Sequence, residues 1–229
     1  MPSWVFWLVV VAIAGVAVIV VGALRDRHVT EARRRELTSP PDRAVPGPGG
    51  DAVPHYLTDL DAGRPPADAA PTDLSPAERA TLERELRTAT EVPVGTAAPG
   101  FVTDTATGRA VLDHPRVLVC RDPVTSLRAL LAFLEPSLRE QRPCVVVAPE
   151  VHRDVLRTLE VNRLQRRLPV LVLVADGTSR AALSAATGAE PVPAADLQSG
   201  WIPPGAVGTC ARLVSDRRRS WVVGAVDTT

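Results

Sequence analysis

The sequence contains few of the residues with which proteins usually hold nucleic acids. Aromatic residues make up 3% of the 229-residue chain, too few for a platform on which successive bases stack. Lysine is absent, and the 26 arginines are balanced by 26 acidic residues, so the formal net charge is zero. No overall field then attracts a polyanion. We therefore expect no nucleic-acid partner.

Cysteine and histidine are scarce as well. The three cysteines, Cys120, Cys144 and Cys210, are odd in number and lack C-x-x-C spacing, which argues against a disulfide framework and against a zinc site. Two of them fall in apolar, strand-like runs, where buried thiols commonly lie. None of the four histidines lies four residues from another or beside a plausible pair of carboxylates. We therefore expect no metal ion.

Signatures of catalysis and of nucleotide binding are also missing. The chain has no P-loop, no G-x-G-x-x-G fingerprint and no G-x-S-x-G elbow, the motifs that hold phosphates or an activated serine. The sequence therefore gives no reason to propose an enzyme, a nucleotide or another cofactor. An enzyme of unrecognised type is the least favoured interpretation, since it would need a deep polar pocket with converging acids.

The first strong pattern that is present is an apolar run over residues 4–24, without a single charge. As a helix it would be roughly 31 Å long, about the thickness of a bilayer's hydrocarbon core. The basic segment 25–36 follows it, and no basic side chain precedes it. Because positive charge is enriched on the cytoplasmic side, this predicts a single-pass protein of the cell membrane, with the N-terminus outside and the C-terminal domain in the cytoplasm.

Two alternatives concern the same region. Val21-Gly22-Ala23 offers the small residues of a signal-peptide cleavage site, but a signal peptide has a basic start and a shorter apolar core. The basic segment can also contact anionic lipid headgroups, although an orientation signal is the simpler interpretation. We favour the uncleaved anchor.

A linker and a helix are predicted next. Residues 37–74 are rich in proline, alanine, glycine and aspartate, a composition that does not bury enough apolar surface to fold. We predict a disordered spacer there. A linker helix is predicted over 75–89, because Ser75 can cap it, Pro76 suits its first turn and Glu78 completes a capping box.

The centre of the chain alternates apolar runs with amphipathic segments. The runs at 116–120, 144–148 and 170–174 have the length of strands. Residues 125–139 and 151–168, between them, carry apolar side chains at helical spacing. This order predicts parallel β-α-β units.

Three further elements are expected after these units. An alanine-rich helix is predicted over 179–187, and a loop over 196–205. Two short strands, 211–214 and 220–226, are predicted to form a hairpin around the arginines at 217–219.

Five stretches of this part are recognisable by their order and spacing. They are Pro99-Gly-Phe-Val-Thr-Asp104, His114-Pro-Arg-Val-Leu-Val119, Leu131-Ala-Phe-Leu-Glu135, Leu156-Arg-Thr-Leu-Glu-Val-Asn162 and Ser220-Trp-Val-Val-Gly224. Together they resemble the apical domain of GroEL-type chaperonins, and the resemblance covers about 99–226. The third and fourth stretches are similar to the two helices that border that domain's groove.

The resemblance implies an α/β fold of the swivelling β/β/α kind over residues 95–226. It also implies that non-native or extended polypeptide binds in an apolar groove between the two helices. The residues that it places at this groove are Phe101, Leu131, Leu134, Leu156, Glu160 and Val161.

The residues by themselves leave the exposure of these helices open. Two helices with wide apolar stripes can leave a hydrophobic trough for a bound segment. The same leucines can equally belong to the core, because periodicity fixes a face and not its exposure. Core is the favoured assignment for Leu127, Leu130 and Leu159. Both interpretations stay open for Leu131, Leu134 and Leu156.

The chain departs from the family in four ways, one of which is a shorter segment after Val174. Glu160 stands where the family usually has an apolar groove residue, and a carboxylate there would select basic or amphipathic segments. Gly100 replaces an aromatic of the same surface. Counterparts of the domains that carry the family's ATP site and ring contacts are missing, so neither ATP hydrolysis nor ring assembly is expected.

The sequence therefore predicts a membrane-anchored, ATP-independent module that binds polypeptide. The alternative is a non-enzymatic scaffold or adaptor that recognises one specific partner at the cytoplasmic membrane. Many unrelated clients in a pull-down would favour the first function, and one stoichiometric partner would favour the second.

Overall fold

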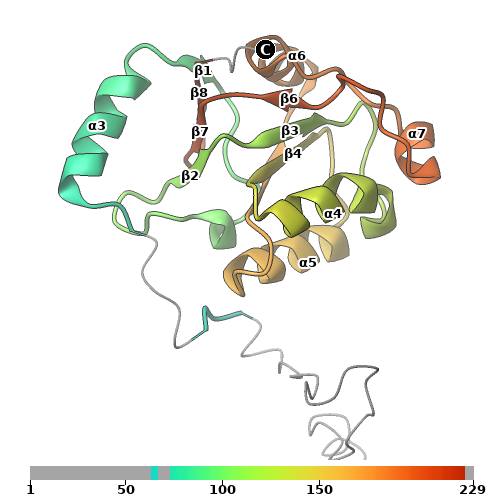
Figure 1. The fold of residues 1–229 in the computed structure, drawn as a ribbon, viewed down its shortest axis with the longest axis horizontal. Helices are drawn as coiled ribbons and strands as arrows, with labels where there is room; N and C mark the ends of the chain where they lie inside the picture. The colour runs from blue at the N-terminus through green and yellow to red at the C-terminus, as the bar shows by residue number, and fades with distance from the viewer. Residues whose placement is uncertain (1–62, 67–72, 225–229) are drawn as a thin grey trace, which may run out of the picture. The chain divides into compact units, whose positions relative to one another are not determined.

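The computed structural model describes residues 63–66 and 73–224, which contain two four-stranded sheets and the helices around them (Figure 1). One sheet has the strand order β5-β4-β3-β6 and the other the order β1-β8-β7-β2. The α/β architecture predicted from the sequence is confirmed.

The first sheet contains the parallel strands that the apolar runs predicted. Its strands are β3 (Arg116–Val119), β4 (Cys144–Ala148), β5 (Val170–Val174) and the short antiparallel β6 (Gly208–Thr209). β3 pairs with β4 and β4 with β5, both in parallel. Every residue of β4 is buried, as expected for a central strand that is covered on both faces.

Helices cover both faces of this sheet. α4 (Leu131–Glu140) and α5 (Arg153–Leu164) lie on one face, and α6 (Gly177–Thr187) lies on the other (Figure 1). α4 connects β3 to β4, and α5 connects β4 to β5. Because such crossovers are right-handed, two steps in the same direction put both helices on one face, as neighbours. α6 leads back across the sheet toward β6 and therefore lies opposite.

The second sheet is antiparallel and includes the predicted hairpin. Its strands are β1 (Thr90–Val92), β2 (Ala110–Asp113), β7 (Arg212–Ser215) and β8 (Ser220–Val223). β7 and β8 pair directly, so the hairpin is confirmed. Asp216 Oδ1 accepts the backbone N–H groups of Arg218 and Arg219 at 2.6 and 2.7 Å, which closes the arginine-rich tip.

The helix predicted at Ser75 forms and packs on the second sheet. α3 runs from Pro76 to Leu86, and its capping box is confirmed, since Ser75 Oγ accepts the Glu78 N–H and the Glu78 carboxylate accepts the Ser75 N–H. Its Leu82 is buried against Trp221 and Val214. α3 therefore belongs to the fold of the domain as a cover over this sheet.

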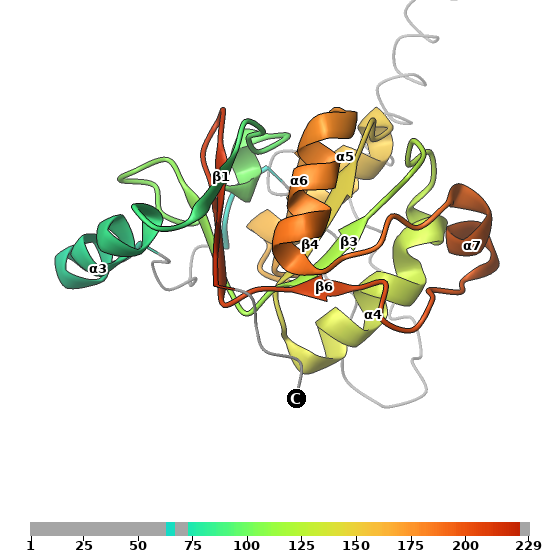
Figure 2. The same ribbon diagram turned by 90° about the horizontal axis from the view of Figure 1, so that it is seen from above.

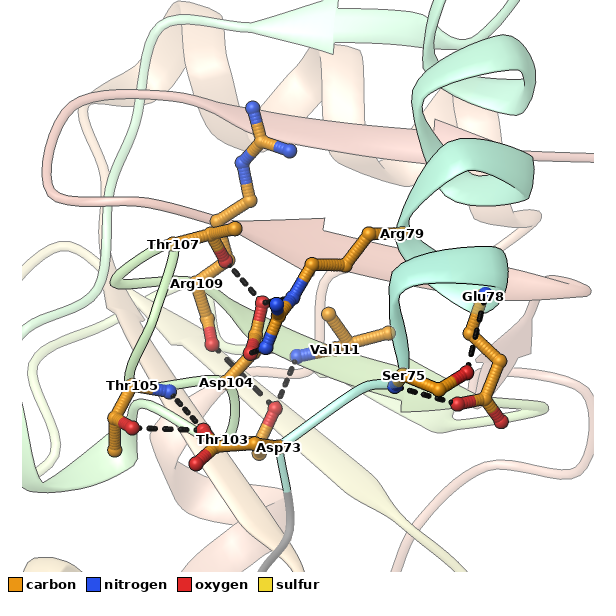
Figure 3. A network of polar contacts seen from close by, with 10 residues as sticks. All are labelled: Asp73, Ser75, Glu78, Arg79, Thr103, Asp104, Thr105, Thr107, Arg109 and Val111. Atoms are coloured by element: carbon orange, nitrogen blue, oxygen red, sulfur yellow. Dashed lines mark hydrogen bonds and ion pairs between the residues drawn. The ribbon is translucent and has the colours of Figure 1, made fainter.

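A polar network fastens the start of α3 to the loop before β2 (Figure 3). Asp104 is fully buried and accepts hydrogen bonds from Arg79 Nε and Nη2, at 3.3 and 2.9 Å, and from the Thr107 hydroxyl. Burial alone raises the pKa of Asp104, but the hydrogen bonds from Arg79 and Thr107 outweigh it and hold that pKa below its ordinary value.

Several short elements differ from the sequence prediction. The helix expected over 125–139 begins as a 3-10 turn, η2 (Leu127–Leu130), capped by Ser126. The expected loop over 196–205 is preceded and partly replaced by α7 (Ala194–Ser199). A second 3-10 turn, η1 (Pro99–Phe101), precedes β2. These elements are too short to show a clear hydrophobic period.

The single-pass membrane location predicted from the sequence is corrected by the structure. Within the described residues no helix has the length and apolar character needed to cross a bilayer. The longest, α5, has 12 residues and is about 18 Å long, against a hydrocarbon core of about 30 Å. The apolar run 4–24, the basic segment 25–36 and most of the linker 37–74 lie outside the described residues.

Candidate functional site

The exposed side of α4 carries two large apolar side chains. Leu131 is 41% exposed and Leu138 is 46% exposed. Residues seven apart lie on the same side of a helix, so these two leucines form one apolar stripe. The side of α4 that faces the sheet is packed: Phe133 is fully buried, and Leu134, at the edge of the stripe, is only 6% exposed.

α5 divides its side chains in the same way. Val155 and Leu159 are buried against the sheet. Leu156, Glu160 and Val161 are partly exposed. Leu156 also packs against the core, so it offers part of its surface to a ligand. We define the α4–α5 surface as Leu131, Leu138, Leu156, Glu160 and Val161.

Two of the predicted groove residues are buried in the structure. Phe101 is fully buried and Leu134 is 6% exposed, and both belong to the main hydrophobic core. Phe101 lies on η1, which is in contact with α5. Its ring points into the protein, because no part of the residue is exposed. Neither side chain can contact a bound polypeptide without an opening of the core.

Leu138 was not among the residues predicted for the site. It follows Leu131 by two helical turns, so the spacing was visible in the sequence. The resemblance, however, placed no groove residue there. Its exposure is what assigns it to the α4–α5 surface.

Glu160 and Gly100 form a direct contact between α5 and η1. Glu160 Oε1 accepts the Gly100 N–H at 2.9 Å. A Cβ atom added to Gly100 would lie 2.5 Å from Glu160 Cγ, well inside van der Waals contact. The two departures from the family are therefore coupled, since a side chain at position 100 would displace this carboxylate.

The bond to Gly100 leaves the carboxylate half engaged. No hydrogen bond to Glu160 Oε2 is found in the part of the chain that the structure describes. One oxygen is thus fixed and the other remains available, one helical turn from Leu156. The α4–α5 surface therefore presents apolar side chains beside a positioned anionic acceptor.

The remaining reactive groups are poorly placed for chemistry. Cys120, Cys144 and Cys210 are buried, and burial raises the pKa of each thiol to about 12. Such thiols are protonated at neutral pH and are weak nucleophiles. Among the residues that the structure describes, no group of three or more histidines, cysteines or acids converges as a metal site would require.

Comparison with known proteins connects the chain to chaperonins. Over 81 residues it is 36% identical to chaperonin GroEL 1 of Corynebacterium diphtheriae, which covers 35% of this chain and 15% of that protein. Over 96 residues it is 33% identical to chaperonin GroEL 1 of Corynebacterium glutamicum, with 39% and 18% covered. The chain thus spans less than a fifth of these relatives. No family model matches it.

A solved structure shows a weaker likeness. It is the open-state monomer of a group II chaperonin from Methanococcoides burtonii, with a TM-score of 0.43, 14% identity, and coverage of 62% of this chain and 33% of that one. The similarity in sequence to the two GroEL 1 proteins supports the conclusion that the chain contains a chaperonin-like α/β domain.

Proposed function

We propose that this domain binds non-native or extended polypeptide reversibly, without ATP, through the α4–α5 surface. The observation that carries the proposal is the exposure of Leu131 and Leu138, at 41% and 46%, on α4, together with the partial exposure of Leu156 and Val161 on α5, which covers the same face of the sheet (Figure 1). Side chains of this kind are normally buried. The similarity to chaperonins supports polypeptide as the ligand.

The exposed apolar area sets the strength of binding. Full burial of a leucine or valine side chain contributes about 1.5 to 3 kcal/mol. Because these side chains are already half-buried, covering the rest of the α4–α5 surface contributes about 3 to 4 kcal/mol before the costs of association. On its own this free energy corresponds to a monovalent Kd no tighter than about 1 mM, which suits a site that releases its ligand without ATP.

Glu160 gives the surface a preference among polypeptides. Its free oxygen lies one turn from Leu156 and is held by the bond to Gly100. In a segment where an arginine or lysine adjoins an apolar residue, the basic side chain can pair with that oxygen while the apolar side chain covers Leu156. Acidic segments are repelled by the same charge. The proposed ligands are therefore basic, amphipathic segments.

Substitutions on the two helices test the proposal. In the full-length chain, Leu131→Ser with Leu156→Ser should weaken the binding of a fluorescent, unfolded model polypeptide by about tenfold, as measured by anisotropy. Val174→Ser is the matched control, because Val174 is a 42% exposed valine on β5. Unchanged affinity in the double variant, or an equal loss in the control, would contradict the assignment of the surface.

The burial of Phe101 and Leu134 favours a second candidate function. Without them the exposed apolar surface is small, and a small surface also fits a scaffold that recognises one defined partner. A panel of unrelated unfolded polypeptides separates the two functions. Binding to most of the panel supports general capture, whereas binding to none of it, with one stoichiometric partner in a pull-down, supports the scaffold.

A further inference from the structure

A hollow of about 470 Å³ lies between the start of α4 and the loop that leads from α7 to β6. Figure 2 shows this loop running from α7 to β6. Its walls include Arg116, Ala132, Trp201, Ile202, Pro203 and Val207. The hollow shares no residue with the α4–α5 surface, so the two can be tested separately.

The apolar wall of the hollow is held in place by its own backbone. α7 is capped at its C-terminus by Gly200, which has a φ of 77°, and the Trp201 N–H donates to the Asp196 carbonyl at 3.0 Å. The Ala206 N–H then donates to the Pro203 carbonyl at 3.0 Å, which closes a turn. Trp201 nevertheless remains 54% exposed. An exposed indole beside rigid prolines is a ready contact for an apolar side chain.

Arg116 supplies a fixed positive charge on another wall. Its guanidinium carbon lies 5.3 Å from the centroid of the Phe133 ring. Its Nη1 donates to Ser137 Oγ at 3.3 Å and to the Phe133 carbonyl at 3.5 Å. These contacts orient the group but do not neutralise it.

The rest of the Arg116 guanidinium is free within the described residues, where it forms no ion pair and where Nε and Nη2 donate no hydrogen bond. The Nε and Nη2 hydrogens form the edge with which an arginine binds a carboxylate through two parallel bonds. An oriented, unpaired edge of this kind complements an anion.

We propose that this hollow binds the C-terminal residue of a polypeptide whose last side chain is apolar. The terminal carboxylate pairs with the Nε–Nη2 edge of Arg116, and the side chain packs against Trp201. In the last residue of a chain the carboxylate and the side chain are attached to the same Cα, so the two groups lie close together in a fixed arrangement. The hollow also has the size of a small-ligand site, for which 300 to 1,000 Å³ is roughly typical. The proposal rests on the proposed function only in taking polypeptide as the ligand.

The test compares two peptides that differ in one group. A peptide that ends in leucine with a free carboxylate, and the same peptide with an amidated end, are titrated into the full-length chain by calorimetry. The acid should bind about tenfold more tightly, since the amide cannot form the paired bonds. Arg116→Gln should abolish this preference, and Arg116→Lys should restore part of it. Trp201→Ser, in an exposed loop, should weaken the binding of both peptides.

Controls separate this site from other sources of binding. Arg84→Gln, on the exposed side of α3, should leave the preference unchanged. Leu131→Ser with Leu156→Ser should also leave it unchanged, even if these substitutions abolish binding to the α4–α5 surface. Equal affinity of acid and amide overturns the proposal. N-acetyl-leucine carries the same carboxylate and side chain and should therefore compete with the peptide acid, and a failure to compete also overturns the proposal.

Discussion

Replacement of the buried Asp104 should detach α3 from the rest of the domain. The Asp104 carboxylate accepts two hydrogen bonds from Arg79 and one from Thr107, and it is fully buried. Asp104→Ala leaves the donors on Arg79 and Thr107 without their acceptor. Unsatisfied buried donors cost about 1 to 3 kcal/mol each. Because Arg79 is 30% exposed and can turn to water, we expect a loss of about 3 kcal/mol in total.

The assay is urea denaturation followed by tryptophan fluorescence, which includes the signal of Trp221, a residue that packs against α3 and is 7% exposed. Asp113→Ala is the matched control, because Asp113 pairs with Arg212 but is 58% exposed. Exposed ion pairs contribute about 0 to 1 kcal/mol, so the control should lose less than that. If both variants lose the same free energy of unfolding, burial is not the reason why Asp104 stabilises the domain.

The same carboxylate predicts how stability depends on pH. The pKa of Asp104 is lower in the folded than in the unfolded chain, so its contribution is complete above the unfolded pKa of about 3.9. That contribution is lost as the pH falls through the folded pKa. The free energy of unfolding of the unmodified chain should therefore fall below about pH 4 more steeply than that of Asp104→Asn, which does not titrate.

Three further predictions concern single contacts. Gly100→Ala should lower stability by about 1 kcal/mol in thermal unfolding, because the new Cβ displaces Glu160 and breaks its hydrogen bond to the Gly100 N–H. In a chain that already carries Glu160→Ala, the same substitution should cost less stability. Equal costs in the two backgrounds would show that the two positions are not coupled. Cys144 should resist iodoacetamide at pH 8 in the folded chain and react after unfolding, since burial raises the pKa of its thiol to about 12; rapid labelling of the native chain would count against this. Ser75→Ala should lower stability by about 1 kcal/mol through loss of the α3 cap, and an unchanged urea midpoint would speak against the cap.

The central strands could be predicted from sequence because their burial is complete. β4 and β5 have the same first and last residues as the apolar runs in the sequence. A strand that is covered on both faces is apolar at every position, so its ends are marked by the first polar residues. β1, β6 and α7 have three, two and six residues. Contacts with distant strands define such elements, and no local period in the sequence marks them.

The candidate site was predictable in its helices but not in its exposed residues. Leu131 and Leu134 lie one turn apart in the same apolar stripe, yet one is 41% exposed and the other 6%. A stripe wider than the contact with the sheet must leave some members outside. Which members remain outside depends on how the helix is rotated over the sheet. Only the packing of Phe133 and its neighbours settles that rotation.

Gly100 and Glu160 looked like two separate losses of apolar surface, sixty residues apart in the chain. In the fold they are one feature, because the missing side chain makes room for the carboxylate and the freed backbone N–H binds it. An unanchored glutamate on α5 would point to water and leave Leu156 to bind apolar segments unaided. The anchored one holds a charge beside that leucine. What distinguishes this surface from a purely apolar groove is therefore this positioned charge, and the absence of a side chain at Gly100 is what allows it.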